Sequence, residues 1–150
     1  AGNFERIKES YYTAIKYALI IMIISGIFIF MTSGIIPTFF SDSLEVNHFG
    51  KKYLQISAFV LPAYPIFFLS NGFFMALKKS ENALITNFFR NVVLPVITFY
   101  VASYLMADFN TFFWIWVVSN WIFSISLLLI VLYYIKKKLN TLSTVTYPRP

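Results

Sequence analysis

The sequence has 150 residues, of which 59% are hydrophobic, 21% aromatic and 12% charged, whereas an average soluble domain has about 25% charged residues. Its 12 basic and six acidic side chains are too few to cover a soluble domain of this size without wide apolar patches, which disfavours a soluble fold. Cysteine is absent and histidine occurs once, which disfavours disulfides, thiol nucleophiles and metal sites.

The basic residues, which give a net charge of +6, occur in small groups between long neutral stretches. This distribution is typical of a membrane protein and differs from the basic face of a nucleic-acid-binding domain. We therefore expect the lipid bilayer, and no nucleic acid, as a partner.

The start of the chain has a helical pattern of apolar residues. They recur every three or four positions, at Phe4, Ile7, Tyr11, Ala14 and Ala18. This spacing predicts an amphipathic helix over residues 1–16, which extends the first membrane span into the cytoplasm.

Four neutral or nearly neutral stretches follow, and each is long enough to cross a hydrocarbon core, which takes about 20 helical residues. They predict transmembrane helices at about 17–41, 53–77, 83–107 and 109–135, with a polar segment, Asp42 to Lys52, between the first two. Membrane strands would be shorter and would alternate apolar with polar residues. We expect an all-α polytopic membrane protein whose four-helix region covers residues 17–139, followed by a disordered cytoplasmic tail at 140–150.

The orientation follows from the loops. Ten basic residues fall on or near the side of the two termini, and only Lys51 and Lys52 fall on the other side. Because cytoplasmic loops are enriched in Lys and Arg, both termini are predicted to be cytoplasmic and the protein to lie in the plasma (inner) membrane.

Charged residues inside the predicted spans are rare, since no Asp or Glu lies there and Arg90 is the one basic candidate. We expect its long side chain to reach the membrane interface or a lipid phosphate, with a role in a pore as the alternative. Lys136, Lys137 and Lys138 close the fourth span and predict contact with anionic lipid.

The second span contains two prolines near its middle, Pro62 and Pro65, and Pro95 lies in the third span. Each proline is expected to kink its helix, and broken helices are where transporters place substrate sites. One face of the second span predicts a substrate pocket for a bulky apolar or cationic molecule, formed by Tyr64, Phe68, Asn71 and Met75. Ordinary helix packing is the alternative. No catalytic or cofactor-binding motif is present, so we expect neither an enzyme nor a cofactor.

Short motifs follow one another in a distinctive order: Ala1-Gly2-Asn3 before a charged helix, then Lys52-Tyr53-Leu54-Gln55-Ile56, then Phe73-Phe74-Met75-Ala76-Leu77-Lys78-Lys79, then Asn82-Ala83-Leu84, Arg90 and Leu94-Pro95. In this order they resemble helices nine to twelve of the multidrug and toxic compound extrusion (MATE) family, whose motifs are of GAGN and YLRI type at the first two positions. Met75 and Lys78 depart from the glutamine and glycine common in that family.

The resemblance implies a twelve-helix, two-lobe antiporter that exports drugs, other xenobiotics or metabolites in exchange for Na⁺ or H⁺ by alternating access. The chain would be a fragment, since it opens without methionine. Its partners would be the remaining helices of the parent transporter and a small amphipathic or cationic substrate, and the coupling cation would bind outside the fragment.

Two alternatives remain, the first within transport and the second from a different class. A lipid-linked oligosaccharide flippase of related architecture would need a basic cavity, for which Arg90 is the candidate residue. A self-contained four-helix scaffold or exporter is the second alternative, but an exporter of that kind is expected to carry a carboxylate inside the membrane, which the predicted spans lack.

Overall fold

The computed structural model describes residues 2–146, with side chains over residues 4–138, and within this range the chain is helical and contains no strand. The α-helices are α1 (Gly2–Thr32), α2 (Leu44–Ala58), α3 (Ala63–Ala76), α4 (Ser80–Phe88), α5 (Leu94–Tyr104) and α6 (Phe109–Thr146). A 3₁₀ turn, η1 (Ile36–Phe39), follows α1, and a π-helical turn, η2 (Phe89–Val93), joins α4 to α5.

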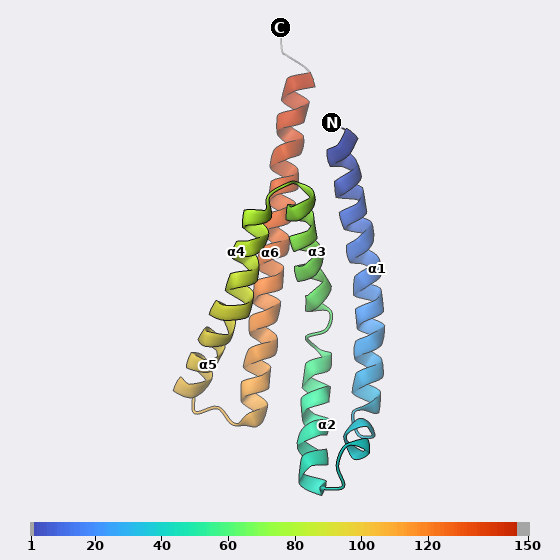
Figure 1. Ribbon diagram of the computed structural model, residues 1–150, viewed down its shortest axis with the longest axis vertical. Coiled ribbons are helices and arrows are strands. Elements are labelled where there is room, and N and C mark those ends of the chain that lie inside the picture. Colours follow the sequence, from blue (N-terminus) through green and yellow to red (C-terminus); the bar gives the residue numbers. More distant parts are fainter. Residues whose placement is uncertain (1, 147–150) are drawn as a thin grey trace.

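The helices run up and down beside one another, and α1 begins at the same end of the bundle at which α6 ends (Figure 1). Helix α3 lies inside this arrangement and packs against α6, α1 and α4. The main core therefore surrounds α3, where Phe67, Phe73 and Phe74 meet Tyr11 from α1 and Val131 from α6.

Within the part of the chain that the structure describes, three helical stretches are long and apolar enough to cross a membrane, namely Phe4–Thr32, Ser80–Tyr104 and Phe109–Lys138. Helices α2 and α3 together make a fourth if they count as one span, although they are bent by 48° at the break between them. The all-helical membrane fold predicted from the sequence is confirmed in this form. Many apolar side chains on α1 are exposed, as expected of a surface that faces lipid or further helices.

Helix α1 runs without interruption from Gly2, with Phe4 and Tyr11 buried and Glu5 and Glu9 exposed. The helix ends at Thr32, nine residues before the end of the neutral stretch. Gly34 and Pro37 follow within five residues of this end, and both residue types are disfavoured in the interior of a helix.

The polar segment at 42–52, predicted to be a break between spans, is largely helical, because α2 begins at Leu44. Ser43 has the extended backbone of an N-cap residue, with φ −72° and ψ 122°, and its carbonyl accepts the N–H of Asn47 at 3.0 Å. Glu45 in the first turn suits the positive end of the helix dipole. The charged residues of this segment show that it is polar, but they do not show that it is a loop.

Pro95 lies at the start of α5, directly after η2. Proline offers no N–H to the carbonyl four residues earlier, and the chain widens here to a π turn in which the Leu94 N–H bonds to the Phe89 carbonyl. The irregularity expected at Pro95 is therefore a π turn within the stretch Ser80–Tyr104.

Helix α6 continues to Thr146, seven residues into the segment at 140–150 that was predicted to be a disordered tail. No proline or glycine interrupts the sequence between Pro95 and Pro148, so nothing in its composition stops the helix earlier. The last part of the predicted tail, residues 147–150, lies outside the described residues.

Candidate functional site

Side chains of α6 donate hydrogen bonds to backbone carbonyls at the break between α2 and α3. Pro62 has no N–H for the Ala58 carbonyl, and the Ala63 N–H turns back to the Val60 carbonyl at 3.0 Å, so the Phe59 carbonyl loses the partner it would have in a continuous helix. The indole Nε1 of Trp121 donates to that Phe59 oxygen at 2.8 Å.

One helical turn further along α6, Ser124 Oγ donates to the carbonyl oxygen of Ala63 at 3.1 Å, and this bond is buried. Trp121 and Ser124 are three residues apart and so share one face of α6. The sequence analysis did not identify either residue as a partner of the break, because their register against α3 depends on a tertiary contact about 60 residues along the chain.

On the other side of the break, α1 approaches closely at Gly26. A Cβ atom at this position would lie 3.0 Å from the Ala58 oxygen, the carbonyl for which Pro62 has no donor. Glycine therefore allows the backbone of α1 to lie against a carbonyl of the broken helix. A largely apolar pocket of about 420 Å³ opens here, with Ile23, Pro62 and Trp121 in its lining.

A second pocket, of about 500 Å³, lies between the break and the pair α5 and α6. Tyr53 and Ser57 from α2, Tyr64 from α3, Pro95 from α5 and Trp116 from α6 contribute to its walls. Apolar and aromatic walls with a few hydroxyl groups are typical of sites for small molecules. Pockets thus flank the break on two sides.

The four residues predicted to form a substrate pocket lie along one side of α3, but their surroundings differ. Tyr64 is half-buried, Asn71 is only 6% exposed, and Phe68 and Met75 are 62% and 63% exposed. Tyr64 lines the pocket between the break and the pair α5 and α6. Their role in substrate binding remains a prediction.

Asn71 is tied to α4 by a hydrogen bond in which the Thr86 hydroxyl donates to Asn71 Oδ1. Thr86 Oγ1 also lies 2.9 Å from the Asn82 carbonyl oxygen in the preceding turn of α4. Within the described part of the chain, Asn71 Nδ2 is buried and has no hydrogen-bond partner. The amide thus links α3 to α4 and keeps one donor free.

Arg90, in η2, lies over a group of three aromatic rings on α3. Its Cζ atom is 4.1 Å from the ring centre of Phe67, 4.7 Å from that of Tyr64 and 5.5 Å from that of Phe68. We call Tyr64, Phe67 and Phe68 the ring cluster. The predicted contact of Arg90 with lipid stays a prediction. Phe67 was not singled out from the sequence, although it follows Tyr64 by three residues on the same side of α3.

The lysines at the end of the fourth span occupy the end of the bundle where α1 begins. Lys136 is exposed, and Lys138 Nζ lies 4.7 Å from the ring centre of Phe4. Lys79, in the turn after α3, makes a similar contact of 4.6 Å with Tyr134. Contact of this basic end with anionic lipid stays a prediction.

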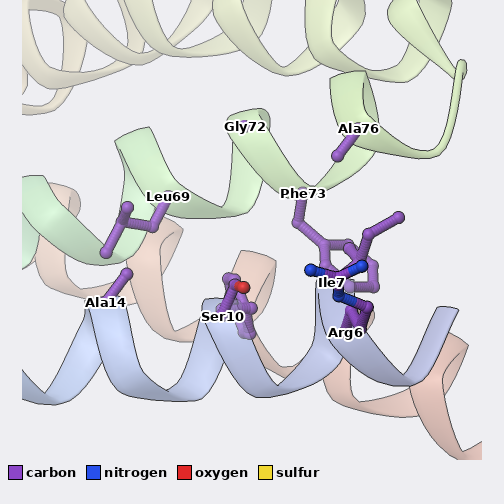
Figure 2. A pocket seen from close by; sticks show the side chains of 9 residues that line it. Arg6, Ile7, Ser10, Ala14, Leu69, Gly72, Phe73 and Ala76 are labelled. Atoms are coloured by element: carbon purple, nitrogen blue, oxygen red, sulfur yellow. The ribbon is translucent and has the colours of Figure 1, made fainter. Parts of the chain in front are cut away.

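A shallow groove of about 320 Å³ separates α1 from α3 at this end of the bundle. Figure 2 shows Leu69 and Ala14 facing each other across the groove, with Gly72 contributing backbone only. Next to it the Tyr11 hydroxyl and Ser70 Oγ form a buried hydrogen bond of 3.0 Å. Over residues 4–138 no group of three or more His, Asp and Glu side chains is placed to hold a metal ion.

Comparison with known proteins assigns the family. The MatE family model matches residues 1–101 of the 150, a range that includes the helix break and Arg90. No curated protein and no solved structure gives a significant match. Together with helices long and apolar enough to cross a membrane, this match shows that the chain is an integral membrane protein that belongs to the MatE family of transporters.

Proposed function

We propose that this chain forms the C-terminal part of a twelve-helix antiporter that exports small amphipathic molecules, including xenobiotics, in exchange for Na⁺ or H⁺. The family match supports transport, and the broken span α2–α3 is the observation that carries the proposal. Transporters form substrate sites at discontinuous helices, where backbone carbonyls and polar side chains are available inside the membrane.

In this proposal α3 and the break form part of the wall of a central cavity. The pocket that contains Tyr64 and Trp116 supplies aromatic surface for the substrate, and the ring cluster lies next to it along α3. Exposed Phe68 faces the space that the other helices of the transporter would enclose. Bending at residues 59–62 lets α2 and α3 move separately when access alternates between the two sides.

The coupling cation would bind in the other helices of the transporter, and both ends of this chain would be cytoplasmic. The common location of the start of α1 and the end of α6 supports this topology (Figure 1). Cysteine labelling in sealed vesicles of known orientation tests this topology. Single cysteines are introduced near each end of the chain and in the loop at Ser41. Labelling of Ser41→Cys from the cytoplasmic side would contradict the topology.

The deciding experiment is transport by the full-length protein in sealed vesicles. Efflux of a fluorescent amphipathic dye is measured after a Na⁺ or H⁺ gradient is imposed. The proposal expects efflux that depends on one of the gradients and stops when an ionophore dissipates it. Efflux equal to that of protein-free vesicles under both gradients would contradict the proposal.

Arg90 favours a second candidate, a lipid-linked oligosaccharide flippase of related architecture. A guanidinium inside a predicted span suits the pyrophosphate of such a lipid. Flipping of a lipid-linked sugar by the reconstituted protein, without gradient-dependent dye efflux, would favour this candidate over the antiporter.

A further inference from the structure

Arg90 lies far from the ends of its membrane-spanning stretch. It is the eleventh residue of Ser80–Tyr104, with fourteen residues after it, and its guanidinium lies over Phe67 in the interior of α3. Arginine stays protonated in proteins, so this is a permanent positive charge at a depth where charge is costly unless it has a function.

Within the described residues this charge has aromatic neighbours and no acidic partner. There Arg90 makes neither an ion pair nor a hydrogen bond, and its guanidinium lies over Tyr64, Phe67 and Phe68. Rings that stack on a guanidinium hold its plane but accept few of its five N–H groups. The donors of Arg90 are therefore oriented and unpaired within this part of the chain.

Within the described part of the chain a second unpaired donor lies on α3, one helical turn from Phe67, the ring nearest to Arg90. Asn71 follows Phe67 by four residues on α3, is 6% exposed, and has no partner for Nδ2 among the described residues. Its bonded neighbour Thr86 precedes Arg90 by four residues. Buried N–H donors beside a fixed positive charge suit a ligand that supplies several acceptor oxygens.

We propose that Arg90, positioned by Tyr64, Phe67 and Phe68, is an oxyanion-binding site for an amphipathic molecule that carries a sulfonate, carboxylate or phosphate group. Its occupant is a transported anion or the phosphate of an anionic lipid. If the occupant is a transported molecule, the inference rests on the proposed function and specifies an anionic substrate. The guanidinium of Arg90 repels cations from the three rings, which would otherwise attract them.

The test compares two ligands of one shape and opposite charge. The full-length protein is placed in phosphatidylcholine nanodiscs, and equilibrium dialysis measures its binding of naphthalene-2-sulfonate and of trimethyl(naphthalen-2-yl)ammonium. Arg90→Gln is expected to weaken binding of the sulfonate by about tenfold or more, the usual effect of losing a charge-assisted hydrogen bond. The same variant should bind the ammonium at least as well as the native protein does.

Two further variants separate the site from general effects of charge and folding. Arg90→Lys keeps the charge but not the two-pronged donor, so its affinity for the sulfonate should fall between those of the native protein and Arg90→Gln. Lys79→Gln removes one positive charge that also lies over a ring, but at the end of the bundle, and should leave affinity unchanged. If Arg90→Gln does not fold, native affinity in Arg90→Lys overturns the proposal.

A lipid arm identifies the source of the oxyanion. Adding phosphatidylglycerol to the nanodiscs weakens binding of the sulfonate to the native protein if a lipid phosphate occupies the site, and this effect is expected to disappear in Arg90→Gln. If phosphatidylglycerol has no effect while binding of the sulfonate still depends on Arg90, the occupant is a soluble anion. Sulfonate affinity that is equal in the native protein and folded Arg90→Gln, with no Arg90-dependent lipid effect, overturns the proposal.

Equilibrium binding does not need a gradient, so this result is independent of the antiport assay. Arg90-dependent binding without gradient-driven efflux would remove the proposed function and leave the oxyanion site in place. Gradient-driven efflux together with sulfonate binding that does not depend on Arg90 would support the proposed function and overturn the oxyanion site.

Discussion

The indole Nε1 of Trp121 donates a hydrogen bond of 2.8 Å to the carbonyl oxygen of Phe59, and so a side chain of α6 occupies an acceptor exposed by the break in the second span. In a continuous helix this acceptor would take the N–H of Ala63. In lipid no water replaces a missing partner, and an unpaired carbonyl is costly. The bond therefore stabilises the bent form of α2–α3.

Trp121→Phe is expected to lower stability by about 1–3 kcal/mol, because it removes the donor to the Phe59 oxygen. Thermal unfolding in a mild detergent, followed by circular dichroism at 222 nm, measures the change. Trp116→Phe is the matched control. Trp116 is on the same helix and also lines a pocket, but it makes no hydrogen bond to the break among the described residues. Equal losses in the two variants would show that the bond contributes nothing of its own.

Gly26 and Gly72 are expected to respond in opposite ways to the same substitution. At Gly26 a Cβ would lie 3.0 Å from the Ala58 oxygen, and a backbone atom moves only at a cost, so Gly26→Ala should destabilise the protein by about 1–2 kcal/mol. At Gly72 no atom lies within 4 Å of an added Cβ, so Gly72→Ala should stabilise α3 by about 0.5–1 kcal/mol. Unfolding under the same detergent conditions compares them. Shifts of the same sign would refute the close approach at Gly26.

The turn after α3 contains a residue in a conformation that favours glycine. Lys78 has φ 58°, and the turn is closed by hydrogen bonds from Lys78 N to the Met75 oxygen and from Lys79 N to the Phe74 oxygen, each 2.9 Å. These two bonds form a Schellman motif, in which glycine is preferred at the left-handed position. Lys78 is therefore strained, because a residue with a Cβ adopts the left-handed conformation only at a steric cost.

Lys78→Gly is therefore expected to raise stability by about 1 kcal/mol, because glycine adopts the left-handed conformation without steric strain. Lys79→Gly removes the same charge from the next position, where φ is −110°, and should not stabilise. Unfolding temperatures of the two variants separate backbone strain from charge. A gain in both would assign the effect to charge.

The sequence predicts the helical type of the spans, because the bilayer favours helices, and its four spans match the structure where α2 and α3 are counted as one. It predicts helix ends less well, because charge marks where the chain becomes polar and not where a helix ends. Leu44 begins a helix inside a polar segment, and α6 continues past Asn140. Helix α1 ends at Thr32, well inside a neutral stretch and shortly before Gly34 and Pro37.

The candidate site could be predicted only in part. Pro62 identifies the break, since a missing N–H is a property of the residue itself. The donors that satisfy the break, Trp121 and Ser124, depend on how α6 packs against α3, and no local pattern encodes that register. The same holds for Arg90, whose stacking on Phe67 requires the turn between α3 and α4 to set the two helices side by side.

Asp108 gives the turn before α6 a defined pH dependence. The hydroxyl and the N–H of Thr111 donate hydrogen bonds to its carboxylate, the latter at 3.1 Å, and these bonds lower the pKa of Asp108 below its ordinary value. A carboxyl whose pKa is lower in the folded state stabilises the fold above its unfolded pKa of about 3.9. That contribution is lost as the pH falls through the lower folded value.

The unfolding temperature of Asp108→Asn is therefore expected to lie below that of the native protein at pH 6–7, and the difference should shrink as the pH falls below about 4. Asparagine keeps an oxygen that can cap α6, so the variant removes the charge and retains the acceptor for the Thr111 N–H. Thr111→Val leaves that N–H but removes the hydroxyl, which is the larger cause of the lowered pKa, and should reproduce part of the effect. Circular dichroism melts from pH 3 to 7 in one detergent measure all three proteins. A difference between the native protein and Asp108→Asn that stays constant over this range would mean that the charge of Asp108 does not contribute to the turn.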